Sequence, residues 1–314
     1  MAGPLTVNSD GGGNAHWVPR VAVQPGSGLL VVWEDYRNGQ PDILGRLYRG
    51  DGVPLGSEFG IVPPAASAAD QYTPHVIWSD SDKYVIGWID RRAGQEVYVQ
   101  RYNPVTGMVG NNTLASSGDT LFINWDMNLA VTPLGRTMAI WGTFGPDNSI
   151  MSRWFSFGVS PIGPPQTRNS STVGRRWSPV AQFRSAGRFG LAWTEFASED
   201  ADITFMAFDT AGNRLLGSEP LLNDDLIGAP ATRPSAVNSS DFLELFAYQS
   251  RQHDDGDIYV SCVSHAGVKP YPSQRVNQDT GYNLQAEPYV TKSPRGCLVV
   301  WLDARAINGS TGQR

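Results

Sequence analysis

The chain repeats one hydrophobic pattern six times, and each copy ends on an aromatic residue in the same register. These aromatic residues, spaced 52 to 55 positions apart, are Trp33, Trp88, Trp141, Trp193, Tyr248 and Trp301. The segment that precedes each one, such as Leu29–Val32, is apolar throughout, which indicates a strand covered on both faces. A fixed period of about 50 residues indicates a repeat architecture.

Each repeat reads as four short strands. A proline opens the first strand in five copies, and Met127 replaces it in the third. Proline suits the first residue of a strand, where no ladder N–H is needed. The second strand is the apolar run, and the third alternates, as in Ile43–Tyr48. A hairpin rich in Gly and Pro leads into the fourth strand. Four strands per repeat and no helical period predict an all-β, six-bladed β-propeller. The alternative is a solenoid, which would need capping repeats.

The two ends of the chain share motifs with the interior repeats. The C-terminal Gly312-Gln313-Arg314 matches the third-strand segment Val99-Gln100-Arg101, and Val7-Asn8 matches the fourth-strand ending Val276-Asn277. We therefore expect the N-terminal strand to complete the last blade, which also removes bare sheet edges. The sequence predicts a single domain over 1–314, with repeats at about 17–71, 72–124, 125–176, 177–231, 232–285, and 286–314 plus 1–16.

Composition narrows the classes of partner. The net charge of −6 disfavours nucleic acid, and no stretch approaches the roughly 18 apolar residues of a membrane span. No signal peptide is recognisable at the N-terminus, so we expect that one was removed or that the chain was cut from a longer protein. Cys262 and Cys297 fall in adjacent repeats, where a bridge is conceivable, but two free, buried thiols are favoured.

The repeat resembles that of large secreted or surface-attached bacterial proteins. The matching motifs are Pro19-Arg-Val-Ala22, Trp33, Gln100-Arg-Tyr102, Leu55-Gly-Ser-Glu-Phe59 and Val276-Asn277. The resemblance covers the whole chain and implies an extracellular or cell-surface location and a role in adhesion, with no catalytic residue. The Trp-x-Asp-x-Arg stretches are also similar to those of sialidase-like propellers, although the Ser-x-Asp-x-Gly-x-x-Trp box of sialidases is absent.

Candidate chemistry concentrates in the loops before the first strand and after the second strand of each repeat. These loops share one face of a propeller and hold most of the acidic residues. Three repeats carry Trp-x-Asp-x-Arg in the second of these loops, with the pairs Asp35/Arg37, Asp90/Arg92 and Asp303/Arg305. Arg37, Arg92 and Arg305 are therefore candidates for binding a sugar or an anion through their planar guanidinium groups. The favoured alternative is scaffolding, in which the Asp caps the loop and pairs with the Arg.

A second repeated position, two residues before each strand-opening proline, is aromatic in four copies. These residues are Trp17, Tyr72, Trp125 and Trp177. Aromatic rings beside carboxylates suit the stacking of sugar rings, which have an apolar face and polar edges. Packing between loops is an equal alternative. The aromatic residues that end the apolar strands are expected in the core between blades.

Two acidic clusters are the places where we expect Ca²⁺ if the chain binds it. Glu199-Asp-Ala-Asp202 supplies Asp200 and Asp202, and Asp254-Asp-Gly-Asp257 supplies Asp255 and Asp257. Ca²⁺ takes six to eight oxygen ligands from flexible acidic loops, but neither cluster has EF-hand spacing. Solvated loops without metal are the favoured interpretation, so no cofactor is expected.

The sequence leaves two classes of function open. The favoured hypothesis is a non-catalytic extracellular binding or structural module, which engages a glycan or a surface protein within a larger assembly. The near-constant period supports this hypothesis, because no repeat carries a large insertion. The alternative is a polysaccharide-cleaving enzyme, a glycoside hydrolase or lyase, with its site at the channel mouth. Its candidate acids and bases by position are His16, His75, Asp126 and Glu287.

Overall fold

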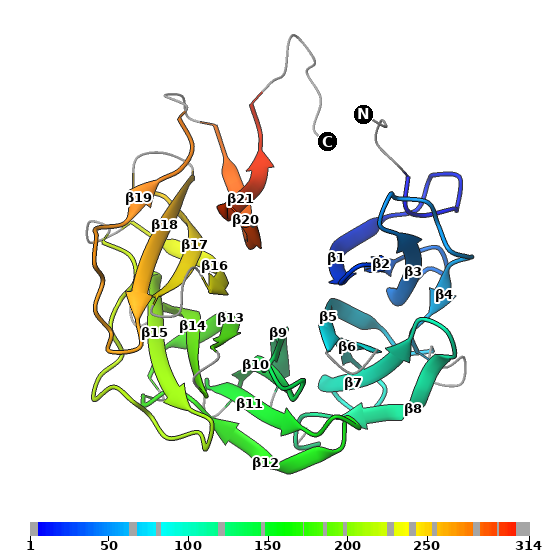
Figure 1. Cartoon of the computed structure of the whole chain (residues 1–314), viewed down its shortest axis with the longest axis horizontal. Coiled ribbons are helices and arrows are strands. Elements are labelled where there is room, and N and C mark those ends of the chain that lie inside the picture. The colour runs from blue at the N-terminus through cyan, green and yellow to red at the C-terminus, as the bar shows by residue number, and fades with distance from the viewer. Residues whose placement is uncertain are drawn as a thin grey trace. The chain divides into compact units, whose positions relative to one another are not determined.

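The structure is a computed structural model in which every described element is a β-strand (Figure 1). It describes all residues except 1–5, 63–67, 80–82, 119–122, 146–147, 172, 185–186, 197–199, 225–228, 239–242, 253–255, 279–282, 294 and 306–314. Over these described residues, no helix is long and apolar enough to cross a membrane. We call the sheet formed by one repeat a blade and number the blades in chain order.

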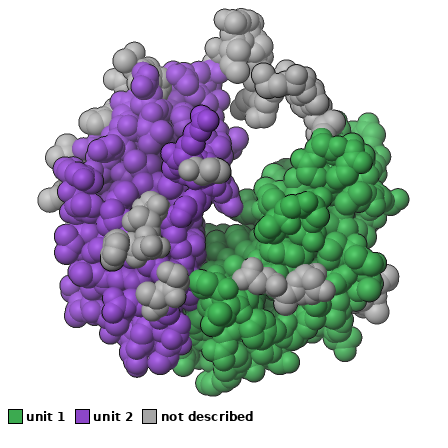
Figure 2. Space-filling model, viewed as in Figure 1, with its two compact units in different colours: residues 1–147, 151–168 green, residues 148–150, 169–314 purple. Residues whose placement is uncertain are grey.

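The chain divides into two compact units (Figure 2). Unit one contains residues 1–147 and 151–168, and unit two contains residues 148–150 and 169–314. All strand pairs within the blades are antiparallel, and neighbours in sequence are neighbours in the sheet. The predicted all-β fold of antiparallel blades of up to four strands is therefore confirmed.

Unit one contains three blades of four strands. Blade one consists of β1 (His16–Gln24), β2 (Gly28–Asp35), β3 (Asp42–Arg49) and β4 (Phe59–Gly60). Blade two consists of β5 (Gln71–Ser79), β6 (Lys83–Asp90), β7 (Glu96–Asn103) and β8 (Gly107–Leu114). Blade three consists of β9 (Ile123–Val131), β10 (Thr137–Phe144), β11 (Ile150–Phe155) and β12 (Pro161–Thr167).

Unit two continues the pattern with fewer long strands. Blade four consists of β13 (Arg175–Phe183), β14 (Arg188–Phe196) and β15 (Asp202–Asp209), followed by isolated bridges. Blade five consists of β16 (Ala231–Asn238), β17 (Leu243–Ser250), β18 (Asp257–Ser264) and β19 (Gln274–Arg275). Blade six is described only over β20 (Gln285–Ser293) and β21 (Gly296–Asp303).

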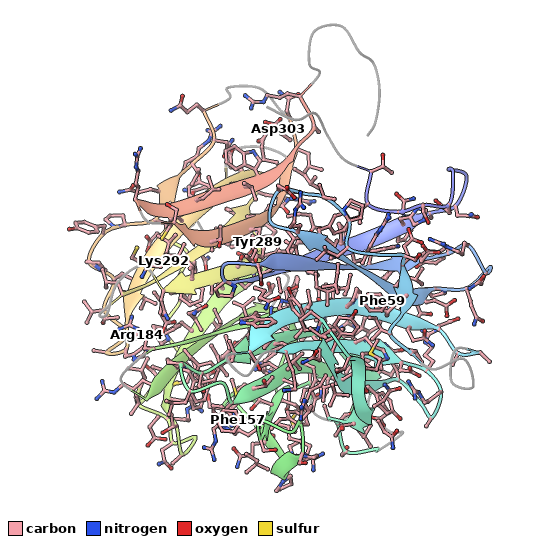
Figure 3. The ribbon with its side chains drawn as sticks, turned by 45° about the vertical axis from the view of Figure 1, so that its right-hand side comes forward. Phe59, Phe157, Arg184, Tyr289, Lys292 and Asp303 are labelled. Atoms are coloured by element: carbon pink, nitrogen blue, oxygen red, sulfur yellow. The ribbon has the colours of Figure 1, made fainter. Side chains whose placement is uncertain are left out.

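The core lies between consecutive blades of one unit. Trp88 of β6 is fully buried in a cluster with Leu30 and Val32 of blade one. Phe59 of β4 (Figure 3) stacks on Tyr102 of blade two, with ring centroids 4.5 Å apart. Trp33, Trp141, Trp193 and Tyr248 are also buried, whereas Trp301 is half-buried, and β20 is the only described sheet neighbour of its strand β21. The apolar strands thus form the predicted core between blades.

The prolines do not open the first strands. β1 begins at His16, three residues before Pro19, and its pairing with β2 shifts register between Trp17 and Arg20. The residue before the proline, or before Met127, has a φ between 36° and 57° in all six blades; these residues are Val18, Thr73, Asp126, Ser178, Arg233 and Glu287. Proline is tolerated at such a β-bulge, where ladder hydrogen bonds are already interrupted.

Residues 6–9 contact the third strand of blade one. The end of blade two makes a similar contact with the third strand of blade three. The Val7 carbonyl accepts hydrogen bonds from Arg46 Nη1 at 3.1 Å and Tyr48 Oη at 2.9 Å. In blade three the corresponding Arg153 donates to the carbonyl of Leu114, the last residue of β8, at 3.4 Å. This match supports the expected N-terminal strand. The pairing partners at 1–5 and 306–314 lie outside the described residues, so six blades and ring closure stay predictions.

Candidate functional site

The Trp-x-Asp-x-Arg motif of blade one is built around the buried Asp35 carboxylate. Asp35 accepts hydrogen bonds from Trp33 Nε1 at 3.0 Å, from the Arg37 backbone N–H at 3.1 Å and from Arg37 Nε at 2.7 Å. Arg37 Nη2 also reaches Glu58 Oε2 at 2.8 Å. Arg37 therefore links the end of β2 to the segment just before β4.

His16 brings the loop before β1 onto the same carboxylate. Its Nε2 lies 3.2 Å from Asp35 Oδ2 and 3.2 Å from Asp10 Oδ2. Burial acts to raise the pKa of Asp35, but hydrogen bonds from Arg37 and Trp33 outweigh it and lower that pKa. The pKa of Asp10 is lowered chiefly by a hydrogen bond from the Asn14 side chain. Both carboxyl groups therefore favour the ionised form beside His16.

Glu58 is held from two sides. Arg37 pairs with its Oε2, and the Ser9 backbone N–H donates a hydrogen bond to its Oε1. These contacts join the N-terminal segment to blade one through a charged side chain. Donors on both oxygens fix the direction of this carboxyl group.

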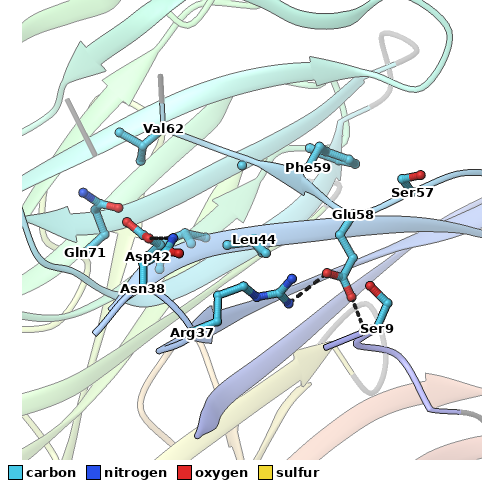
Figure 4. Close-up of a pocket in the computed structure, with 12 residues that line it drawn as sticks. Ser9, Arg37, Asn38, Asp42, Leu44, Ser57, Glu58, Phe59, Val62 and Gln71 are labelled. Atoms are coloured by element: carbon cyan, nitrogen blue, oxygen red, sulfur yellow. Dashed lines mark hydrogen bonds and ion pairs between the residues drawn. The ribbon is translucent and has the colours of Figure 1, made fainter. Parts of the chain in front are cut away.

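Arg37, Glu58 and Ser9 line one side of a cavity of about 470 Å³ in unit one (Figure 4). The cavity lies over β3 and β4 of blade one. Its polar lining is Ser9, Arg37, Asn38, Asp42, Ser57, Glu58 and Gln71, and its apolar lining includes Ile43, Leu44, Phe59 and Val62. A concave site with a few convergent polar groups over an apolar floor suits a small polar ligand such as a sugar residue.

Asp42 is the buried carboxyl group of this lining. Its side chain is buried; Oδ2 accepts a hydrogen bond from Asn38 Nδ2 at 2.9 Å, and Oδ1 has no partner among the described residues. Burial raises the pKa of Asp42, and the charges of Asp35 and Asp70 raise it further. Asp42 therefore keeps its proton to higher pH than an ordinary Asp.

Blade one departs from the repeat at the side-chain donor that contacts this carboxyl group in blades four and five. In blade five Asn277 Nδ2 donates to the corresponding Asp257 at 2.6 Å, and in blade four Asn223 Nδ2 donates to Asp202 at 2.8 Å. Blade one has Val62 at this position, which cannot donate. Asp42 therefore lacks the Asn donor of the corresponding Asp residues in blades four and five, and it lines a cavity.

The repeated aromatic residues differ in exposure. Trp17 is 59% exposed, and its ring centroid lies 5.5 Å from that of Tyr36. Trp125 and Trp177 are also exposed, and Trp177 forms a similar tilted pair with Phe196 at 4.7 Å. Tyr72 is half-buried, donates to Asp70 at 2.5 Å and carries the Arg91 guanidinium 5.0 Å above its ring. Trp17 is the exposed aromatic residue that adjoins the blade-one network.

Arg92 and Arg305 fold back onto the Asp of their own motifs. Arg92 Nη2 lies 2.5 Å from Asp90, and its guanidinium stacks 4.4 Å above the Tyr98 ring. Arg305 Nε lies 2.9 Å from Asp303 Oδ1. These geometries match the scaffolding interpretation. Arg37 has the same contact with its own Asp, but it also lines the cavity.

The other three acid–base candidates belong to strands of other blades. His75 of β5 accepts a hydrogen bond from the Leu129 backbone N–H at 3.3 Å, and burial lowers its pKa to about 3, so the ring stays neutral. Glu287 of β20 pairs with Arg233 of β16 within unit two. Asp126 occupies the left-handed bulge position of β9. Of the four candidates, His16 is the one that contacts Asp35.

The candidate metal ligands do not converge in the part of the chain that is described. Asp202 and Asp257 occupy the same position in different blades and bind Asn223 and Asn277. Asp200 lies two residues before β15, and Asp255 lies outside the described residues. Among the described residues no group of three or more His, Cys, Asp or Glu side chains forms a candidate cation site.

Sequence reasoning missed Asp42, Glu58 and Ser9. A signal was present: the fourth strand of the fifth repeat ends in Val276-Asn277, whereas the first repeat has Ile61-Val62 at that point. Loss of the Asn predicts a carboxylate without its usual partner. Only the folded chain shows that a cavity lies beside it.

No family model matches the chain. No curated protein matches it either. Similarity to solved structures is extensive. An ulvan lyase, described as a polysaccharide lyase of a new family, aligns with a TM-score of 0.57 and 9% identity over 93% of this chain and 82% of its own. An α-L-arabinanase from Penicillium chrysogenum, complexed with arabinobiose, aligns with a TM-score of 0.51 and 12% identity. The alignment covers 72% of this chain and 74% of the arabinanase chain. An exo-β-1,3-galactanase from Clostridium thermocellum aligns with a TM-score of 0.50 and 13% identity. The alignment covers 94% of this chain and 73% of the galactanase chain.

These similarities support the β-propeller fold and correct our expectation about function. We favoured a non-catalytic module because no repeat carries a large insertion. Three proteins with this fold are named as polysaccharide-cleaving enzymes, and two of them align over more than nine-tenths of this chain. A regular blade length therefore does not indicate a non-enzyme, because a few side chains on existing loops are enough for catalysis. The non-catalytic hypothesis, and with it the expectation of no enzyme activity, is wrong on this comparison.

Proposed function

We propose that the chain is a polysaccharide-cleaving enzyme of the glycoside hydrolase type, with its active site in the blade-one cavity. The observation that carries this proposal is a pair of carboxyl groups in opposite settings on one cavity. Asp42 is buried, with one unpaired oxygen and a raised pKa, while Glu58 is held by Arg37 and the Ser9 amide. Glycoside hydrolysis commonly uses one protonated and one ionised carboxyl group.

Asp42 is the proton donor in this proposal. When the glycosidic C–O bond breaks, the leaving oxygen takes the proton that Asp42 holds. A raised pKa keeps that proton available at higher pH, which a general acid requires. The Asn38 amide, 2.9 Å from Oδ2, orients the carboxyl group and leaves Oδ1 without a partner.

Glu58 is the second carboxylate. It either takes a proton from the water whose oxygen adds to the sugar carbon, or adds to that carbon itself before water releases the product. The Arg37 guanidinium and the Ser9 amide fix its direction. Arg37 is in turn anchored by Asp35, so it acts as a positioning residue.

Charge favours a hydrolase of neutral glycans over a lyase of acidic ones. A lyase must bind and neutralise a uronate, which calls for free cationic groups. Arg37 is shared between Asp35 and Glu58, and the whole chain carries a net charge of −6. An anionic polymer would be repelled from this cavity. We propose an extracellular location, because polysaccharides are met outside the cell.

The test is reducing-end release from arabinan, galactan and xylan, with ulvan as the anionic member of the panel. We expect turnover of a neutral polymer, a loss of about 100-fold or more in Asp42→Asn and Glu58→Gln, and native melting of both variants. The matched control is Glu96→Gln, which changes the residue of blade two that corresponds to Asp42. Turnover that survives in Asp42→Asn, or that is lost instead in Asp126→Asn or Glu287→Gln, would place the active site elsewhere.

A further inference from the structure

Next to the cavity network, the exposed Trp17 and the half-buried Tyr36 form an aromatic pair, which we call the aromatic ledge. Trp17 follows His16 in the chain, and Tyr36 stands between Asp35 and Arg37. The two rings lie 5.5 Å apart with 52° between their planes, and Trp17 is 59% exposed. An indole ring held in place and open to solvent is suited to stacking on the apolar face of a sugar.

The ledge is fixed from below by a buried carboxyl group. Tyr36 Oη donates to Glu34 Oε2 at 3.2 Å, and the Thr73 backbone N–H of blade two donates to Glu34 Oε1 at 2.7 Å. The Tyr36 backbone N–H also binds the Ala15 carbonyl at 3.2 Å. These contacts immobilise Tyr36, and the tilted packing then orients Trp17. A preorganised platform loses little entropy when a ligand binds.

Other repeats show what is specific to blade one. In blade two, Tyr72 replaces the Trp, and the Arg91 guanidinium covers its ring. In blade four, Trp177 and Phe196 form a similar pair, but Phe196 has no hydroxyl to anchor, and Trp177 is 41% exposed. In blade one the two ledge residues are chain neighbours of His16, Asp35 and Arg37, and Arg37 lines the cavity.

We propose that the aromatic ledge is a second sugar subsite, which binds the part of a neutral polysaccharide that extends beyond the cavity. This rests on the proposed function for the catalytic step, but the binding itself does not depend on it. Tyr36 of the ledge stands between Asp35 and Arg37 in the chain, and Arg37 lines the cavity, so in this proposal one polymer chain contacts both. The subsite recognises the chain by stacking, without a charged group, and therefore favours neutral sugars.

The experiment compares Trp17→Ala with its matched control Trp177→Ala. Kinetics are measured on the neutral polymer that is cleaved fastest and on its disaccharide, and binding is measured by affinity electrophoresis in gels that contain the same polymer. We expect Trp17→Ala to raise KM for the polymer about tenfold and to weaken retardation in the gel. The kcat/KM on the disaccharide stays within about twofold of wild type, and Trp177→Ala matches wild type in each assay.

The possible results separate the two proposals. In one outcome, wild type binds the polymer, Trp17→Ala does not, and no polymer is cleaved. The proposal of a sugar subsite at the ledge is then supported, and the proposal of a hydrolase is wrong. If turnover depends on Asp42 but Trp17→Ala behaves as wild type on polymer and disaccharide, the ledge is wrong. Equal losses in Trp17→Ala and Trp177→Ala on both substrates would make the Trp pairs scaffolding and would also overturn the ledge. Circular dichroism confirms that each variant is folded.

Discussion

Blades one and two share the Trp-x-Asp-x-Arg motif, and the cavity described above lies over blade one. In blade two, Arg92 stacks 4.4 Å above Tyr98 and donates to Asn112 at 3.2 Å. Glu96, which corresponds to Asp42, accepts a hydrogen bond from Ser116 and one from Asn124 at 3.3 Å. In blade two the donors Ser116 and Asn124 thus contact Glu96, and Tyr98 covers Arg92.

In blade one, three replacements undo that arrangement. Leu44 stands where blade two has Tyr98, since each pairs with the Trp of its own motif in the strand register. Glu58 stands where blade two has Asn112, and Val62 where it has Ser116. Leu44 is smaller than Tyr, Glu58 adds a charge, and Val62 cannot donate a hydrogen bond. Together these replacements leave space beside two carboxyl groups. The comparison teaches that the Asp–Arg pairing of the motif is shared by the two blades, whereas the residues around it differ.

The largest expected effect comes from giving blade one the side chain of blade two. Leu44→Tyr places a ring on the floor of the cavity and beneath Arg37. We expect kcat/KM on the neutral polymer to fall by about 100-fold or more, because the sugar residue no longer fits. The melting temperature should not fall by more than a few degrees, since a Tyr already fits this position in blade two. Steady-state kinetics and thermal melts give both numbers; full activity in this variant would show that the substrate does not use the cavity.

Substituting the Asp of the motif in each blade tests whether the two blades differ in their effect on activity while they have a similar effect on stability. Asp35→Asn should lower the free energy of unfolding at pH 7 by about 1–3 kcal/mol, because hydrogen bonds to a buried carboxylate are weakened. The folded-state pKa of Asp35 is lowered, so its contribution is present above its unfolded pKa and is lost as the pH falls through the folded one. The stability difference should therefore shrink in acid, as urea unfolding at pH 7 and pH 3 would show.

Asp90→Asn is the control for Asp35→Asn, because Asp90 also binds the Trp and Arg of its own motif. It should cost similar stability at pH 7 and leave kcat/KM per folded molecule unchanged. Asp35→Asn should also lower kcat/KM, since Arg37 loses its anchor. Equal kinetic losses in the two variants would contradict the assignment of the site to blade one.

A smaller effect is expected at the two Arg residues. Arg37→Lys keeps the charge but loses the fork that holds Asp35 and Glu58 together, so kcat should fall about tenfold with little change in KM. Arg92→Lys loses its stacking on Tyr98 and should cost about 1 kcal/mol of stability without a kinetic effect. A kinetic loss in Arg92→Lys as large as that in Arg37→Lys would mean that the pair acts only through folding.

The smallest effect is a change in pH dependence. Val62→Asn restores the donor that blades four and five use, so the Asp42 carboxylate gains a hydrogen bond and its pKa should fall. Because the proposed acid must be protonated, the alkaline limb of the kcat/KM profile should move to lower pH, by less than about one unit. Activity near neutrality then declines slightly. An alkaline limb that stays in place would show that Asp42 does not set it.

Unit two contains a buried cluster of charged residues to which we assign no part in the proposed activity. Glu244 is fully buried, with His265 Nε2 at 2.5 Å and Arg184 Nε at 3.5 Å (Figure 3). Burial raises the pKa of Glu244. The cluster contains the same residue types as the blade-one network. It lies at the opposite ends of its strands, where no loop described above contributes to the cavity, and we assign it a structural role.

The sequence by itself determined the repeat, the antiparallel strands and the buried aromatic residues. These features depend on local hydrophobic order, which the chain repeats six times. The repeat also predicted that the Asp and Arg of each motif pair with each other, as Asp90 and Arg92 do. The sequence brought His16, Trp17 and Arg37 forward as candidates, but it ranked them with Asp126 and Glu287, which lie apart from the blade-one network in the chain.

Only the tertiary structure decided which candidates belong together. Ser9, Asp42 and Glu58 lie far enough apart in sequence that no local pattern relates them, and they meet because β3, β4 and the N-terminal segment converge on Arg37. The bulge that precedes each strand proline was also hidden, since a left-handed residue such as Val18 has no side-chain signature. Whether a carboxyl group is a scaffold or an acid depends on its partner, and for Asp42 the missing partner is a Val twenty residues later in the chain.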